Sequence, residues 1–194
     1  MIKTSINILT KCPFTADPKS RLGDLLTKDE RTFISKHMIL NILNETREIK
    51  DTSINLWVYP NYNHIFFKNI FLDYKINLVS QIGNTLNERM SNCILSESRK
   101  SQNIILVGSD IPSLNKNIIL MAMEFLEKNN YVVGPSRDGG FYLFGLKLFN
   151  EDSLDLIKNN EFIQIKNLLD SLGESYKVLQ TLKDIDIKED LLFI

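Results

Sequence analysis

The sequence predicts a three-layer α/β/α fold with a mostly parallel central sheet. Short apolar runs alternate with helical stretches along the whole chain, which is the pattern of strands joined by crossover helices. No internal repeat, low-complexity run or linker interrupts this alternation. The 194 residues suit one such domain and are enough to bury a core. We therefore expect residues 1–194 to form a single domain.

Composition and charge argue against several classes of protein. Hydrophobic residues make up 43% of the chain and charged residues 24%, as in an ordinary globular domain. The formal net charge of −1 indicates no large nucleic-acid footprint. No apolar run is long enough to span a membrane, and the N-terminus reads as a first strand rather than a signal peptide. We expect a cytoplasmic protein that binds neither nucleic acid nor a membrane.

The elements follow from the apolar spacing. We expect strands at residues 5–10, 54–58, 76–79, 104–107, 131–133 and 176–179. We expect a helix that begins after Thr27, where Glu30 would complete a capping box. We expect further helices at residues 85–95, 152–158 and 162–172, and one between residues 108 and 130. Gly173 lies where a helix C-cap is expected. His37 is expected in the core, and His64 in a loop.

Two strand ends in the middle of the chain each offer a carboxylate. Asp110 follows the apolar run 104–107, and Pro112 makes the turn rigid. A carboxylate so placed suits a hard divalent cation that bridges phosphate oxygens. It could instead cap the next helix, but Ser113 and Asn115 are better placed for that role. We therefore expect Asp110 to be a metal ligand.

The second strand end is the stretch from Gly134 to Gly140. Gly139 and Gly140 would let the backbone approach a ligand closely, and Asp138 precedes them. Asp-Gly is also a strong hairpin signal, so a plain turn is the alternative. In open α/β sheets, ligands bind outside the carboxyl ends of the strands. On that basis we expect Asp110 and Asp138 to belong to one site.

Charged residues elsewhere extend this hypothesis. Lys11, Lys19 and Arg21 follow the first strand, and such a cluster is what a phosphate-bearing ligand needs; a solvated basic loop is the alternative. Gln81 and Arg89 are candidate ligand contacts, or surface hydrogen-bonding residues. Near the end of the chain, Asp184 and Asp186 alternate with isoleucines and would share one face of a strand. They could complete a metal site or lie on a solvated edge strand.

Taken together, these motifs resemble the DUF2064 family, whose members have the nucleotide-diphospho-sugar transferase (GT-A) fold. The residues that carry the resemblance are Lys11, Pro13, Lys19, Ser20, Arg21 and Leu22; Gln81, Gly83, Leu86, Arg89 and Met90; Gly108, Ser109, Asp110, Pro112 and Leu114; residues 134–146; and Asp184, Asp186, Glu189, Asp190 and Leu191. Ala16, Thr85 and Asn87 depart from the family pattern, and the tryptophan-containing segment usual before the terminal motif is missing. More distant relatives are guanylyltransferases.

The resemblance implies a metal-dependent glycosyltransferase that uses a nucleotide-diphosphate sugar and a small-molecule acceptor. The implied metal is Mg²⁺ or Mn²⁺ on Asp110 and Asp186. The implied catalytic residues are Asp138 and Arg21. The implied substrate-binding residues are Lys11, Lys19, Arg21, Gln81, Arg89, Gly134, Gly139 and Gly140. A nucleotidyltransferase that releases pyrophosphate and a non-catalytic nucleotide-binding protein are the alternatives, and a homodimer is left open.

Overall fold

The computed structural model describes residues 2–158, 161–186 and 190. Within these residues, seven strands form one sheet in the order β3-β2-β1-β4-β6-β5-β7. The strands are β1 (Ile2–Lys11), β2 (Thr52–Tyr59), β3 (Asn77–Ser80), β4 (Ser101–Gly108), β5 (Tyr131–Pro135), β6 (Phe141–Lys147) and β7 (Tyr176–Val178). The helices are α1 (Lys28–Thr46), α2 (Ile65–Tyr74), α3 (Leu86–Glu97), α4 (Lys116–Lys128), α5 (Asp152–Leu156) and α6 (Phe162–Leu172), with a 3-10 turn η1 (Ser20–Leu22).

The sheet is mostly parallel, as predicted. β3, β2, β1 and β4 run in one direction, and β5 and β7 share it. Among the described strands only β6 is reversed, because it pairs antiparallel with both β4 and β5. The α/β class and the mostly parallel sheet are therefore confirmed.

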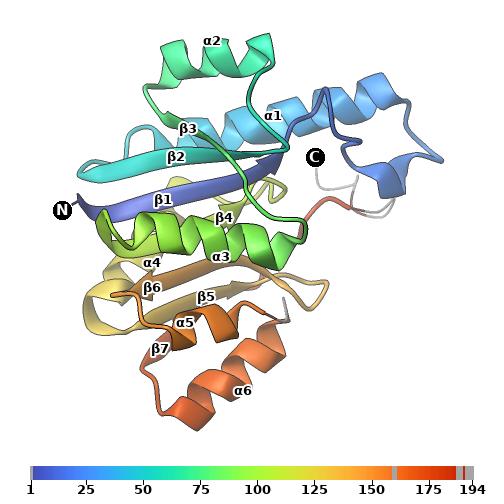
Figure 1. Ribbon diagram of the computed structural model, residues 1–194. Helices are drawn as coiled ribbons and strands as arrows, with labels where there is room; N and C mark the ends of the chain where they lie inside the picture. Colours follow the sequence, from blue (N-terminus) through green and yellow to red (C-terminus); the bar gives the residue numbers. More distant parts are fainter. Residues whose placement is uncertain (1, 159–160, 187–189, 191–194) are drawn as a thin grey trace.

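Helices cover both faces of the sheet and give it two cores (Figure 1). On one face, apolar residues of α1, α2 and α4 pack against β1 and β2, with Ile39, Phe67 and Ile119 fully or almost fully buried. On the other face, α3, α5 and α6 pack against β4, β5 and β6. Strands buried on both faces read as continuous apolar runs, which explains the short apolar segments in the sequence.

Three helix ends follow the predicted capping chemistry. Thr27 accepts the amide of Glu30 while the Glu30 side chain accepts the amide of Thr27, which is a complete capping box. Asn115 caps α4 by accepting the amide of Ile118. α6 ends at Gly173, whose φ of 66° lies in the left-handed region that glycine adopts without strain.

Several sequence expectations were wrong or incomplete. Neither α2 nor β6 was predicted. His37 is exposed rather than buried, with Nδ1 3.1 Å from the carbonyl oxygen of Phe33 one helical turn earlier. His64 is the N-cap of α2 and accepts the amide of Phe66. Residues 183–186 form no strand, although Leu182 makes a single parallel bridge with Ser136; Ile187 and Glu189 lie outside the described residues.

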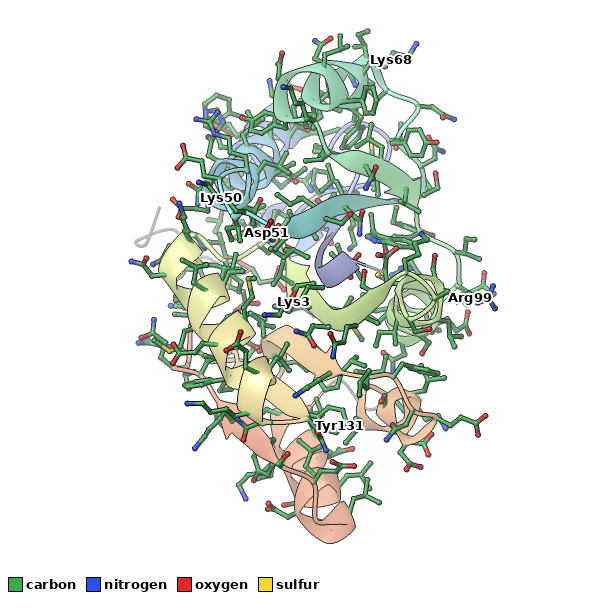
Figure 2. All side chains as sticks on the ribbon, turned by 90° about the vertical axis from the view of Figure 1, so that its left-hand side faces the viewer. Lys3, Lys50, Asp51, Lys68, Arg99 and Tyr131 are labelled. Carbon is green, nitrogen blue, oxygen red and sulfur yellow. The ribbon has the colours of Figure 1, made fainter. Side chains whose placement is uncertain are left out.

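The two ends of the sheet differ in what they carry. In Figure 1 the loop after β1 and residues 182–186 lie together at one end. Figure 2 looks onto the other end, where Lys3, Asp51 and Tyr131 mark the beginnings of β1, β2 and β5. In the part of the chain that the structure describes, no helix combines the length and the apolar character needed to cross a membrane.

Candidate functional site

The site is built where the strand order reverses. β1 lies between β2 and β4; the chain moves from β1 to β2 and β3 on one side and then returns to β4 on the other. Ligands of open α/β sheets bind outside the carboxyl ends of the strands at such a point. Lys11 ends β1, and Asp110 follows the end of β4 by two residues. The Ser109 hydroxyl donates to the Thr10 hydroxyl at 2.9 Å, which joins the two strand ends.

Arg31 of helix α1 holds the loop after β1 in place by hydrogen bonds. The guanidinium of Arg31 donates to the Asp17 carboxylate at 2.7 Å and to the Pro18 carbonyl at 2.9 Å. Lys19 then adopts φ 51° and ψ 43°, a left-handed conformation that is uncommon for a residue other than glycine. In this conformation the Lys19 side chain is 3% exposed, whereas the Arg21 side chain is 70% exposed. The loop thus presents one buried cation and one exposed cation.

Both cations form ion pairs with the carboxylates that we expected to bind the metal. Lys19 Nζ lies 2.8 Å from Asp110 Oδ2 and 3.7 Å from Asp186 Oδ1. Arg21 Nη1 donates to Asp186 Oδ2 at 2.6 Å. Lys11 lines the same small cavity of about 200 Å³ as these four residues. We call this cavity the cation pocket.

The segment that carries Asp186 is held against the rest of the site. The Ile185 amide donates to the Asp110 carbonyl at 3.1 Å. Ile185 is fully buried and packs with Leu22 and Met38, which come from the loop after β1 and from α1. Three distant parts of the chain therefore share one small apolar cluster beneath the ion pairs. This packing explains why Asp186 reaches Asp110 although no strand forms there.

A second cavity of about 400 Å³ opens beside the cation pocket and shares Lys11, Arg21, Asp110 and Asp186 with it. We call it the central cavity. Gln81 and Arg89 line it, as the sequence predicted. Gln81 is buried, and its amide nitrogen donates to the carbonyls of Thr10 and Trp57 at 2.9 and 2.7 Å. Since both donors are used, the side-chain oxygen of Gln81 is the group left to accept from a ligand.

Arg89 lies on the ring of Tyr59. Its guanidinium carbon is 4.2 Å from the ring centroid, which is a close cation–π contact, and Nη1 donates to the Asn84 carbonyl at 3.2 Å. Gly83, in the same loop, has a φ of 130°, and a side chain there would meet Glu88 Cβ at 2.7 Å. Glycine at this position therefore allows the loop to turn tightly onto α3.

Asp138 faces a third cavity of about 310 Å³, which Arg21, Arg137, Asp184 and Asp186 also line. Asp138 Oδ1 accepts the Ser136 hydroxyl and, at 3.0 Å, the Gly140 amide, so the carboxylate holds its own turn. Burial raises the pKa of the neighbouring Asp184 carboxyl, and the negative charges of Asp138 and Asp186 raise it further. Asp138 is therefore near the site, and its hydrogen bonds also fit the plain-turn alternative.

The three predicted glycines lie in different surroundings. Gly134 is buried in β5 and is not among the residues that line these cavities. A Cβ at Gly134 would lie 2.5 Å from Cζ of Tyr142, so the missing side chain makes room for that ring. Gly139 has a φ of 94° and open space around it. The carbonyl of Gly140 accepts the Ser136 amide at 3.0 Å and closes the turn.

Sequence reasoning missed Tyr59 and Tyr142, which both line the central cavity. Tyr142 is buried, its hydroxyl donates to the Gln180 carbonyl at 3.1 Å, and burial raises its pKa. The apolar run at residues 141–146 could have placed Tyr142 on a buried strand had β6 been recognised. Tyr59 could have been found as the last residue of β2, at the same sheet end as Lys11, with which it is in register.

The two aspartates fit a divalent cation. They approach one ammonium group from two segments of the chain, and their oxygens are ligands that Mg²⁺ and Mn²⁺ prefer. Among the described residues, no three side chains of the His, Cys, Asp and Glu types gather as a metal site. An ion on Asp110 and Asp186 would therefore take its remaining ligands from phosphate and water, as Mg²⁺ commonly does.

The fold is the one found in nucleotide-diphospho-sugar transferases and nucleotidyltransferases. The family model described as "Uncharacterized protein conserved in bacteria (DUF2064)" matches residues 42–161, and the chain belongs to this family. The predicted resemblance is thus confirmed. The basic loop at residues 11–22 and Asp186 lie outside the matched range.

Curated relatives and solved structures agree with this class. The 2-phospho-L-lactate guanylyltransferase of Methanocaldococcus vulcanius is 25% identical over 179 residues, which cover 89% of this chain and 76% of the relative. The enzyme of the same name from another Methanocaldococcus is 24% identical over 180 residues, covering 89% and 74%.

Among solved structures, a protein assigned as a nucleotide-diphospho-sugar transferase from Desulfovibrio desulfuricans has a TM-score of 0.86 and 21% identity, covering 98% of this chain and 85% of that one. A 4-diphosphocytidyl-2C-methyl-D-erythritol synthase from Anaerococcus prevotii has a TM-score of 0.63 and 13% identity, covering 98% and 94%. A Mycobacterium tuberculosis protein solved in complex with manganese has a TM-score of 0.57 and 13% identity, covering 98% and 96%.

These similarities confirm the fold, and the relatives' names agree with the predicted transferase class. The names of the curated relatives favour the nucleotidyltransferase alternative over the glycosyltransferase that we expected first. The single domain, the roles of the site residues, the cytoplasmic location and a homodimer stay predictions.

Proposed function

We propose that the chain is a metal-dependent nucleotidyltransferase that joins a nucleoside monophosphate to a small acceptor and releases pyrophosphate. One observation carries the proposal: Lys11, Lys19 and Arg21 converge with two carboxylates at the switch point of the sheet. A triphosphate with its metal ion needs several cations and a pair of carboxylates in one place. The names of the two guanylyltransferase relatives support the same reaction.

In this reaction an oxygen of the acceptor forms a bond to the α-phosphorus of a nucleoside triphosphate. The bond from that phosphorus to the bridging oxygen breaks, and pyrophosphate leaves with the electron pair. The cation pocket supplies what the leaving group needs, since Lys11 and Arg21 are exposed cations that can hold phosphate oxygens. Arg21 is the candidate catalytic cation, because its planar guanidinium can bind two oxygens at once.

Mg²⁺ or Mn²⁺ on Asp110 and Asp186 would neutralise charge on the phosphates when bound. Support for a divalent ion comes from the convergence of the two aspartates and from the manganese complex of a protein with the same fold. The side chain of Asp110 is 49% exposed and that of Asp186 is 35% exposed, so both carboxylates are accessible to an incoming ion.

The nucleoside would lie in the central cavity, on the β1 and β2 side of the phosphates. Gln81 offers a fixed acceptor oxygen there, and the Arg89 guanidinium on the Tyr59 ring offers a flat surface for a base. The acceptor would lie in the third cavity, where Arg137 can attract an anionic group. Lys183 also lines this cavity and is paired with Asp190 at 2.9 Å. Asp138 lines that cavity and is the candidate general base or acceptor contact.

A pyrophosphate-release assay tests the proposal. The chain is incubated with each of the four nucleoside triphosphates, Mg²⁺ or Mn²⁺, and 2-phospho-L-lactate as the first acceptor, which the relatives' names suggest. We expect pyrophosphate and a nucleotidyl product from one triphosphate, and loss of both in Asp110→Asn. Release of a nucleoside diphosphate from a nucleotide sugar, without pyrophosphate from any triphosphate, would instead establish the glycosyltransferase.

A further inference from the structure

The side chain of Lys19 occupies the gap between the two carboxylates assigned to the metal ion. Its ammonium lies 2.8 Å from Asp110 and 3.7 Å from Asp186, and the side chain is 3% exposed. Within the described residues, the ammonium has these ion pairs but no hydrogen bond of good geometry. A buried ammonium in such a place depends on the two carboxylates for its stability, because it has lost its water.

We propose that Lys19 is a built-in cation that competes with the divalent ion for Asp110 and Asp186, so that the metal binds together with a polyphosphate and not before it. The inference rests on the proposed function for the identity of the metal and of the polyphosphate. It goes beyond that function by giving Lys19 two successive partners, first the carboxylates and then a phosphate.

The charges of the described groups explain the competition. Lys19 and Arg21 together balance Asp110 and Asp186, so the pair of carboxylates is already neutralised. A divalent ion that entered between the carboxylates would meet the ammonium at close range, and like charges repel each other at that distance. The ammonium must leave as the metal enters.

An anion bound beside Lys19 would give the displaced ammonium a new partner. The cation pocket offers the place for that anion, because Lys11, Ser20 and Arg21 line it beside Lys19. A lysine is suited to such a move, since its charge is compact and its stem is flexible, whereas the guanidinium of arginine is rigid. Metal and polyphosphate should therefore strengthen each other's binding by the same factor.

Binding of Mn²⁺ alone, followed by electron paramagnetic resonance of the free ion, tests the proposal without any nucleotide. We expect weak binding to the wild-type chain and binding tighter by about tenfold or more in Lys19→Met, a factor within the usual range for coupled sites. Lys11→Met is the matched control. It removes the same charge from the same pocket, but Lys11 makes no ion pair with either aspartate in the described structure. We expect it to change Mn²⁺ affinity much less.

Two further variants keep the result interpretable. Adding Asp110→Asn to Lys19→Met should return Mn²⁺ binding to the weak level, which shows that the gained site is this one. Lys19→Gln replaces Lys19→Met if the latter does not fold, as judged by circular dichroism. The proposal is overturned if a folded Lys19 variant binds Mn²⁺ no more tightly than the wild type. That outcome leaves the proposed reaction intact, because pyrophosphate release is measured separately.

Discussion

At the scale of single residues, the missing side chain at Gly134 makes room for the Tyr142 ring, which lines the central cavity. Gly134→Ala would place a Cβ 2.5 Å from Cζ of the Tyr142 ring, and the ring is buried on β6. We expect the free energy of unfolding, measured with urea, to fall by about 1–3 kcal/mol, as for other overpacked interiors. Nucleotide binding should weaken as well, because the ring lines the cavity.

Gly108→Ala is the matched control for this change in stability. Gly108 also lies on a central strand, but a Cβ there would have open space around it, apart from its neighbours in the chain. We expect its free energy of unfolding to change by less than about 1 kcal/mol, since Gly→Ala at an unstrained position alters mainly the unfolded chain. Equal losses for both variants would mean that the Tyr142 contact is not the cause.

The raised pKa of Asp184 should make the stability of the fold depend on pH. Burial and the nearby Asp138 and Asp186 charges disfavour its ionised form in the folded state. In the window between the unfolded and the raised folded pKa, the folded state binds more protons, so its stability falls as the pH rises through that window. Asp184→Asn should therefore stabilise the chain at neutral pH, and the gain should vanish below about pH 4.

Urea unfolding at a series of pH values from 3 to 8 measures this difference. Asp24→Asn serves as the control, because Asp24 is an exposed carboxylate in the loop beside η1. A constant gain from Asp184→Asn across the whole pH range would contradict the electrostatic explanation.

At the scale of elements, helix α1 acts on the site through the loop that it supports. Arg31→Met would remove the hydrogen bonds to Asp17 and Pro18 while keeping much of the apolar stem. We expect a loss of about 1–3 kcal/mol in the free energy of unfolding, the usual cost for hydrogen bonds to charged groups. Affinity for nucleotide, measured by calorimetry, should fall several-fold, because Lys19 directly follows Pro18 in that loop.

Lys28→Met is the control for Arg31→Met. It removes a positive charge from the first turn of the same helix, at an exposed position. We expect little change in either measurement. Weaker nucleotide binding in Lys28→Met of the same size would point to the overall charge of α1 and not to the loop.

The elements that sequence reasoning found and missed differ in their local signals. Strands β1, β4 and β5 were found because short apolar runs end in Gly, Pro or Asp. Helix α2 was missed because its sequence, IFFKNIFLDY, leaves Phe71 and Leu72 exposed and so lacks a clean polar face. Strand β6 was missed because it is buried on both faces of the sheet, so no alternation of apolar and polar residues marks it.

At the scale of the whole molecule, topology explains why much of the site was predictable. Lys11 ends β1 and Asp110 follows the neighbouring strand β4, so a parallel sheet brings them together without further information. The position of the Lys19 ammonium was not predictable, because it depends on a left-handed backbone and on the contacts of Arg31. Asp186 likewise reaches the site through the burial of Ile185, a long-range contact that no local pattern encodes.

Because the site joins segments far apart in the chain, its ligands should stabilise the whole fold. A nucleotide at 100 times its Kd adds about 2.7 kcal/mol to the free energy of unfolding. For a chain of this size, that corresponds to a rise in Tm of about 5–10 °C. We expect this rise with the correct nucleoside triphosphate and Mn²⁺ together, and a much smaller one in Asp110→Asn. A flat response to every nucleotide and nucleotide sugar, with and without metal, would contradict the proposed nucleotide site.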